Sequence, residues 1–142
     1  MAEAEAVPKP LPRPTPLTQP FWDATKEHRL VMPRRKDGTC FWYPRVLEPG
    51  TLADGWTWAP VGGRGTVYSY TIDRRGTAQA FAADIPYVIA IVELEEGPHF
   101  TTNIVGCALG DVRIGMAVEA TFDDVDDTIT LVRFRTLPPS KQ

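Results

Sequence analysis

Residues 62–136 carry the pattern that most restricts how this chain can fold. Short segments rich in β-branched and aromatic residues alternate there with turn residues. This pattern predicts strands at 65–74, 87–95, 99–105, 116–123 and 128–135, with a turn or short helix at 108–114. Five strands this short and this close together are typical of a small barrel.

The faces of two predicted strands indicate how the barrel is covered. Along 116–123 apolar and polar residues alternate, so one face packs inward and the other meets water. The segment 87–95 is apolar on both faces, and its outer side is expected to meet the N-terminal helix or a partner. The order of three strands, a connecting turn and two strands favours an oligonucleotide/oligosaccharide-binding (OB) barrel in a mainly β chain.

Composition limits the chain to one globular domain with a small appendage. Its 142 residues are 43% hydrophobic and 23% charged, which is enough to fold without disulfides. Cys40 and Cys107 are the only cysteines, so neither a disulfide framework nor a Cys-x-x-Cys pair is present. A net charge of -3 argues against binding nucleic acid through bulk electrostatics. Without a leader or an apolar membrane-spanning run, we expect a cytoplasmic protein with no membrane partner.

Proline dominates the N-terminal segment. It occupies every second position from Pro8 to Pro16, which fixes φ and removes backbone donors, so residues 1–17 are expected to form an extended arm. Two interpretations stay open: a mobile tail, and an arm that lies along the surface of a partner. A short tail is expected again at 137–142.

A single helix is expected within residues 18–33, between the arm and the first strands. Proline in the first turn of a helix is favourable, so Gln19 and Pro20 indicate a start there. The pattern predicts a helix from about 19 to 30. Pro33 is expected to end the element that precedes it.

Residues 34–61 are rich in turn pairs, with short aromatic runs between them. The pattern predicts small hairpins that are too short to have a core of their own. An irregular segment of this length in a compact protein is usually held by a metal, and no set of thiols is present here to bind one.

Side chains that could carry catalysis are few. The serines are Ser69, inside a predicted strand, and Ser140, in the tail, which makes a serine hydrolase improbable. His28 and His99 are the only histidines, and each is more typical of an exposed surface residue than of a general acid or base. Cys107 lies near His99 in sequence, but both fit barrel residues around a turn. We therefore expect no catalytic residue.

Two groups of residues are candidates for contacting phosphate. Backbone amides of a glycine-rich turn beside an arginine can contact an anion, although this turn precedes a strand and not a helix. A second basic group is interleaved with aromatic residues, a mixture that suits stacking on adenine and pairing with phosphate. A solvated basic face around a small aromatic core is the alternative. The candidates are Arg34, Arg35, Lys36, Arg45, Gly63, Arg64 and Gly65.

An ordered series of motifs spans residues 18–136. It consists of FWDATKEHRLVMPRRKDGTCFWYPRVLEPG, WTWAPVGGRGTVYSYTI, DIPYVIAIVELEEG, TTNIVG and DVRIGMAVEATFDDV. With these motifs the chain resembles the OB-fold family that has an N-terminal rubredoxin-like zinc ribbon. The resemblance implies an N-terminal helix over 18–33, a finger over 34–61 and an OB barrel over 62–136.

The chain departs from this family at the metal ligands. Members usually have one Cys-x-x-Cys before the aromatic-proline segment and a second one after it. The matching positions here hold Arg35, Gly38, Glu48 and Thr51, and Cys40 lies two residues past the second position. We expect no structural zinc and no other resident cofactor. The finger is expected to be held by packing of Trp42, Tyr43, Val46, Leu47, Trp56 and Trp58, with a partner's surface completing the cover.

The resemblance also implies a function, because members of the family accompany thiolases and acyl-CoA hydratases. It implies a non-catalytic accessory subunit of a hetero-oligomer. The expected partner is a lipid-transfer-protein-type thiolase or aldolase, or an acyl-CoA hydratase, and the subunit would help hold or channel acyl-CoA. Steroid side chains and fatty acyl chains are the expected acyl groups, and the phosphate candidates named above become contacts for CoA.

Aromatic residues of the expected helix and finger are the candidates for the partner interface. Candidate interface residues are Phe21, Trp22, Phe41, Trp42 and Tyr43, although the first two fit equally a helix that docks on the body.

A protein that binds single-stranded nucleic acid is the main alternative function, suggested by Tyr68 and Tyr70 on the first barrel strand. An independent acyl-CoA hydratase is the third, without a positioned acid–base pair to support it.

Overall fold

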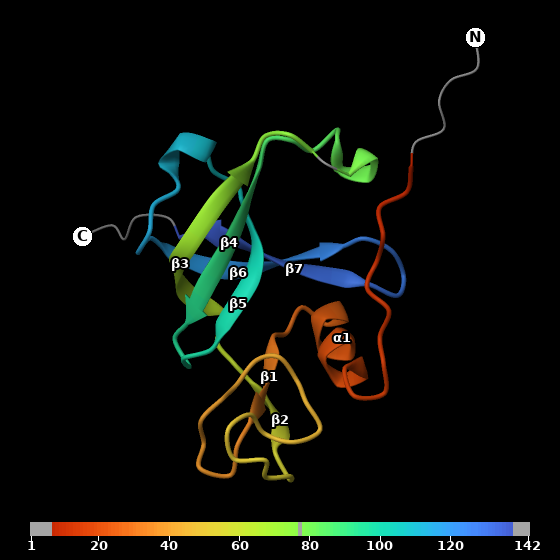
Figure 1. The fold of residues 1–142 in the computed structure, drawn as a ribbon, viewed down its shortest axis with the longest axis vertical. Helices are drawn as coiled ribbons and strands as arrows, with labels where there is room; N and C mark the ends of the chain where they lie inside the picture. Colours follow the sequence, from red (N-terminus) through yellow and green to blue (C-terminus); the bar gives the residue numbers. More distant parts are fainter. Residues whose placement is uncertain (1–6, 77, 138–142) are drawn as a thin grey trace.

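The computed structural model describes residues 7–76 and 78–137 of the chain. A helix, a small two-stranded sheet and a barrel follow one another, and the finger lies at one end of the molecule (Figure 1). The elements are α1 (Gln19–Lys26), β1 (Val31–Arg34), β2 (Thr57–Pro60), β3 (Arg64–Asp73), η1 (Gln79–Phe81), β4 (Tyr87–Leu94), β5 (His99–Val105), η2 (Leu109–Asp111), β6 (Ala117–Asp124) and β7 (Thr130–Thr136).

The barrel is closed in the strand order β3-β4-β5-β7-β6. Neighbouring strands are antiparallel except β5 and β7, which run parallel where Ile104 lies beside Phe134. The short 3-10 helix η2 lies within the expected connection between the third and fourth barrel strands. The predicted mainly β fold with a five-stranded OB barrel is therefore confirmed.

Strand β4 has apolar residues on both faces, as its sequence indicates. Its inward side chains are all buried, and they are Val88, Ala90, Val92 and Leu94. On the outer face Ile89 is half-buried between Thr71 of β3 and Asn103 of β5. The main contacts of helix α1 are with β7 and β1, and not with the outer face of β4 where the helix was one of the expected neighbours. Polar residues of the adjacent strands flank that face instead.

Helix α1 ends at Lys26, so the prediction of a helix to about residue 30 is wrong at its end. His28 adopts φ 58, and the N–H of Arg29 donates to the carbonyl of Ala24 (2.9 Å), which turns the chain away. The left-handed residue stops the helical repeat. Among the described residues, none of the helices has the length and hydrophobicity that a membrane span requires.

The finger is built on β1 and β2, which pair antiparallel with Val31 opposite Pro60. Pro33 lies inside β1, so the expectation that it ends the preceding element is wrong. A two-stranded sheet consists only of edge strands, where the missing N–H of proline is tolerated. Between the two strands, one isolated bridge joins Arg34 to Cys40, and the remaining backbone as far as β2 is irregular.

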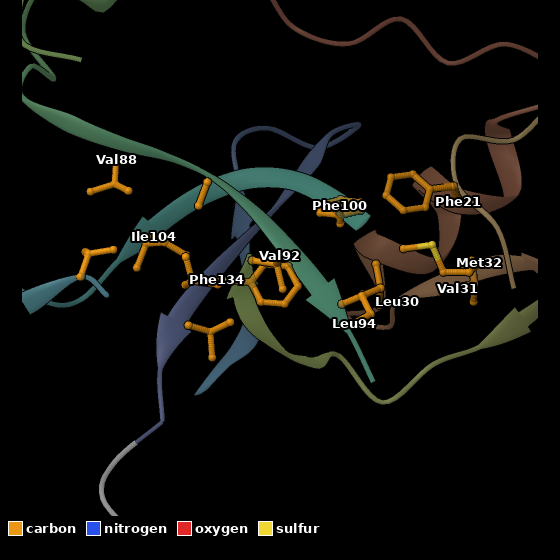
Figure 2. Packing of buried hydrophobic residues seen from close by; sticks show 14 of the residues in the cluster. Phe21, Leu30, Val31, Met32, Val88, Val92, Leu94, Phe100, Ile104 and Phe134 are labelled. Atoms are coloured by element: carbon orange, nitrogen blue, oxygen red, sulfur yellow. The ribbon is translucent and has the colours of Figure 1, made fainter. Parts of the chain in front are cut away.

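One apolar core joins helix, finger and barrel. Figure 2 shows this cluster running from Val88 in the barrel past Phe134 and Phe100 to Phe21 and Met32. The ring centroid of Phe21 lies 6.4 Å from that of Phe100. The helix and the finger are therefore fixed to the barrel by shared burial, which is the dominant stabilising term in folding.

The arm lies against the barrel over the residues that the structure describes. Figure 1 shows it, in red, passing beside α1 and the hairpin between β6 and β7. Lys9 forms an ion pair with Asp84 and lies 5.9 Å from the ring centroid of Phe81. The first six residues of the expected arm and the last five of the expected C-terminal tail lie outside the described residues.

Candidate interaction site on the finger

The aromatic residues predicted to form a partner interface divide between core and surface. Phe21 and Phe41 are only 4% and 5% exposed, so they are core residues and cannot offer a docking surface in this structure. Trp22 and Trp42 are half-buried, and the ring of Trp42 packs 4.9 Å from that of Phe21. Tyr43 alone is well exposed. Of the two interpretations of Phe21, the structure therefore supports the one in which its side chain packs helix α1 against the rest of the chain.

Large apolar side chains are exposed on the finger, in the segment 43–52. Tyr43, Val46, Leu47 and Leu52 are 56%, 74%, 43% and 72% exposed, and we call them the finger patch. The prediction that Tyr43, Val46 and Leu47 hold the finger by packing is wrong, because these side chains face solvent. Several exposed apolar residues on one loop are typical of a surface that meets another molecule.

Hydrogen bonds and aromatic packing hold the backbone beneath the finger patch. The indole N–H of Trp56 donates to the carbonyl of Arg45 (2.7 Å), and its ring packs edge-on against Phe41 (5.7 Å). The N–H of Glu48 donates to the carbonyl of Ala53 (2.9 Å). A loop fixed in this way loses less conformational entropy when it binds.

The basic group on the finger is only partly available for binding. Arg34, Lys36 and Arg45 are exposed. Arg35 is half-buried, and its Nε lies 3.4 Å from Oε1 of Glu48, so its charge is already paired. Arg35 is therefore a structural residue, while the other three are exposed cations of the finger, which we call the basic rim.

The glycine-rich turn before β3 serves strand packing. The N–H of Gly62 donates to the carboxylate of Glu96 (3.0 Å), which means that the turn already faces an anion. Gly63 and Gly65 are buried, and a Cβ at Gly65 would lie 2.3 Å from a carbonyl oxygen of β4. These two glycines therefore have no access to phosphate, and of the three residues predicted here to contact it only Arg64 is exposed.

One cleft lies away from the basic rim. It measures about 890 Å³ and is lined by the arm, Trp22 and residues of β5 and β7. The guanidinium of Arg133 also lines it, where it donates to Asp123 (3.1 Å) and Asn103 (2.7 Å). Because this positive charge is already paired, the cleft is poorly suited to a phosphate.

The histidines and cysteines do not form a nucleophile–base pair among the residues that the structure describes. His28 contacts Asp124 (2.9 Å) and His99 contacts Glu93 (3.1 Å), both at the surface. His99 begins β5, whereas Cys107 lies beyond the other end of that strand. Burial raises the pKa of the Cys107 thiol, and the nearby Asp111 adds to the shift, so the neutral form predominates at neutral pH.

The two tyrosines that suggested nucleic-acid binding lie on different faces of β3. A bulge between Val67 and Ser69 changes the alternation of the strand. Tyr68 is exposed and packs on His99 (4.4 Å between ring centroids), whereas Tyr70 is partly buried against the core. The pair therefore does not form a stacking platform for bases.

The residues at the family's zinc-ligand positions do not fit zinc. Arg35 and Glu48 pair with each other, Thr51 donates to Glu48, and Gly38 has no side chain to coordinate a metal. A guanidinium is a cation without an acceptor and cannot coordinate a metal. Burial raises the pKa of Cys40, which disfavours the thiolate that zinc requires. Across 7–76 and 78–137, no group of three or more His, Cys, Asp or Glu residues is placed to hold a metal ion.

Comparisons of the chain with known proteins identify its relatives. Residues 58–123 match the family described as "ChsH2, C-terminal OB-fold domain". A probable enoyl-CoA hydratase alpha subunit from Thermomonospora curvata is 35% identical over 145 aligned positions, and the match covers 99% of this chain and 44% of that protein. A 3-oxo-4,17-pregnadiene-20-carboxyl-CoA hydratase alpha subunit from Mycobacterium tuberculosis is 34% identical over 109 residues, 75% of this chain and 34% of that protein. The chain thus spans less than half the length of these two relatives.

A solved structure agrees over nearly its whole length. A chain of the structure described as "Ltp2-ChsH2(DUF35) aldolase" is 33% identical and superposes with a TM-score of 0.78. The match covers 89% of this chain and 98% of the other. The resemblance inferred from the motifs is confirmed, and the chain belongs to the DUF35 family of ChsH2-like OB-fold proteins.

Proposed function

We propose that the chain is a non-catalytic accessory subunit that binds an acyl-CoA enzyme of the thiolase or hydratase type. The observation that carries the proposal is its match to the aldolase structure whose description names ChsH2(DUF35) together with Ltp2. The hydratase alpha subunits among its relatives point to the same class of thioester substrate. Among the described residues, no histidine is placed as a base beside a cysteine nucleophile, so catalytic groups would come from the partner.

The finger patch is the proposed docking surface for this partner. The finger that carries the patch lies at one end of the molecule (Figure 1), and the backbone of the loop is already fixed. Burying one such side chain contributes roughly 1.5–3 kcal/mol relative to leaving it exposed. The rim of Arg34, Lys36 and Arg45 favours a partner surface with an apolar centre and acidic surroundings.

Contacts to CoA form the second part of the proposal. The exposed arginines and lysine of the rim, with Arg64 at the start of β3, are the basic residues of the predicted set that remain available for phosphate. A guanidinium pairs well with phosphate oxygens through two parallel hydrogen bonds. Steroid acyl groups are the preferred cargo, because one relative is named as a hydratase of a pregnadiene carboxyl-CoA.

Reconstitution from purified proteins tests this function. The tagged chain is purified from its native cells, the accompanying subunit is identified by mass spectrometry, and both proteins are then produced separately. We expect near-equal amounts in one complex and turnover of acyl-CoA only when both are present. A monomeric chain that hydrates or cleaves acyl-CoA by itself would overturn the proposal, and so would a chain that binds neither a thiolase-type nor a hydratase enzyme.

Substitutions on the finger patch locate the interface. Val46→Asp and Leu52→Asp place a charge where the partner should bury an apolar side chain, and we expect affinity to fall at least about tenfold. Ile114→Asp is the matched control, since Ile114 is 70% exposed on the turn before β6. Equal affinity for the patch variants and the control would place the interface elsewhere.

A further inference from the structure

The finger contains two backbone turns that carry the positions at which the family's zinc ligands are expected. In the first turn, the N–H of Arg35 donates to the carbonyl of Thr39 (2.8 Å). In the second, the N–H of Glu48 donates to Ala53 and the N–H of Leu52 donates to Glu48 (2.9 and 3.0 Å). No regular strand pairing joins the two turns, so side chains have to do so.

A polar cluster of Arg35, Glu48 and Thr51 joins them. Nε of Arg35 lies 3.4 Å from Oε1 of Glu48, and the hydroxyl of Thr51 donates to the same oxygen (3.1 Å). The side chain of Glu48 is 6% exposed, and that of Arg35 is 23% exposed. Glu48 is the only ionisable residue in the buried set of the described chain.

Arg35 ties this cluster to the rest of the finger. Its Nη1 donates to the hydroxyl of Thr39 (3.1 Å), within the first turn. Its guanidinium lies 5.0 Å from the ring centroid of Phe41, a buried residue of the finger. One side chain therefore contacts both turns and the aromatic packing between them.

We propose that the Arg35–Glu48–Thr51 cluster fastens the two turns of the finger in the place where relatives of the zinc-ribbon type use a metal. A buried carboxylate without a partner is strongly destabilising, so the turn that carries Glu48 is stable only while Arg35 and Thr51 face it. The pair is neutral overall and needs neither a thiol nor a metal. The finger patch is thereby held in place without zinc. This inference concerns the isolated chain and does not rest on the proposed function.

Trypsin provides the first test, because Lys36 and Arg45 are exposed cleavage sites within the finger. Glu48→Gln removes the charge that pairs with Arg35 and leaves the size of the side chain unchanged. We expect cleavage at the two sites to become at least about tenfold faster, as the finger opens more often. The matched control is Glu27→Gln, which removes the same group from an exposed ion pair with Arg29 and should leave the cleavage rate unchanged.

The double variant Arg35→Met/Glu48→Met keeps the test valid if single variants unfold. Removing both charges leaves no buried charge without a partner in this cluster, so the double variant should be cleaved more slowly than Glu48→Gln. Equal cleavage rates for the wild type and Glu48→Gln would overturn the proposal. A double variant cleaved faster than Glu48→Gln would also contradict it.

Metal analysis provides the second test and addresses the equivalence to a zinc centre. The wild-type chain should contain well under one zinc per chain, and chelator should not change its cleavage rate. The variant R35C/G38C/E48C/T51C should bind one zinc through four thiolates and recover slow cleavage when zinc is added. One chelator-resistant zinc per wild-type chain would overturn the proposal, and a cysteine variant that binds no zinc would refute the positional equivalence.

Discussion

The barrel and the finger of this protein are held together in different ways. In the barrel, five strands pair into one closed sheet, and every inward side chain of β4 is buried. In the finger, two strands of four residues bracket an irregular segment held by one buried ion pair, one indole hydrogen bond and edge-on aromatic contacts. The stability of the barrel is therefore distributed over many similar contacts, whereas the stability of the finger depends on a few individual ones. Substitutions should therefore act globally in the barrel and locally in the finger.

The largest expected effect concerns the centre of the barrel. Phe134 is fully buried and lies beside Phe100. Phe100 in turn packs against Phe21 of α1, so Phe134 lies where the barrel core meets the helix. Phe134→Ala should lower the free energy of unfolding by about 3–5 kcal/mol, because it leaves a cavity in a packed core. Urea denaturation followed by circular dichroism measures this change, with Val125→Ala on the exposed hairpin as control. A loss confined to the barrel, with the finger still protected, would contradict the shared core.

Gly65→Ala tests the close approach of β3 and β4. A Cβ at Gly65 would lie 2.3 Å from the carbonyl oxygen of Glu93, which forces the strands apart. We expect a loss of more than about 2 kcal/mol in the free energy of unfolding. Gly110→Ala is the matched control, since nothing lies within 4 Å of its Cβ position. Equal stability of the two variants, measured by urea denaturation, would show that the barrel yields at this point.

Trp56→Phe tests whether finger stability is local. The substitution keeps an aromatic ring but removes the hydrogen bond to the carbonyl of Arg45. About 1 kcal/mol of local stability should be lost. Hydrogen exchange should become faster for amides of the finger and remain unchanged for amides of β4 and β5. Faster exchange throughout the barrel would mean that the two regions unfold as one unit.

The smallest effect concerns the contact between the end of α1 and the β6–β7 hairpin. Hydrogen bonds from Thr130 and then from His28 lower the pKa of Asp124 below its ordinary value of 3.8. A lowered pKa in the folded state means that the stabilisation is present above the ordinary value and is lost as the pH falls through the folded value. Asp124→Asn should therefore flatten the acid side of the stability curve below about pH 4.

Thermal unfolding between pH 2 and pH 7 measures this difference. Asp127→Asn is the control on the same hairpin, because Asp127 is exposed in the turn beyond the contact with His28. We expect its midpoint to follow that of the wild type at every pH. Parallel curves for the wild type and Asp124→Asn would show that this contact contributes nothing to folding.

The local sequence pattern is most informative where the backbone repeats. All five barrel strands were found to within about two residues of their bounds, because strand side chains alternate with period two. It is less informative at ends and in irregular loops. The end of α1 depends on the left-handed residue His28, whose ring stacks on Phe122 of β6 (5.1 Å). A contact between residues so far apart in sequence leaves no local signal.

Contacts between residues distant in sequence also explain why the predicted site was only partly correct. Amino-acid type indicated that Phe21, Phe41 and Tyr43 were candidates for an interface, but type alone does not state which aromatic residue is buried. The role of Arg35 was missed for a related reason. A run of basic residues looks uniform in sequence, and only its position opposite Glu48 separates Arg35 from Arg34 and Lys36.

The barrel, the order of the chain's segments and the resemblance to a family could all be predicted before folding is considered, because they follow from periodicity or from ordered motifs along the chain. The tertiary structure decided which residues are surface and which are core. It buried Phe41 and exposed Val46, although both lie in one short segment of the finger. It also brought Arg35 to Glu48, which no spacing rule predicts. Burial and charge pairing depend on neighbours that are distant in sequence, and folding alone brings them together.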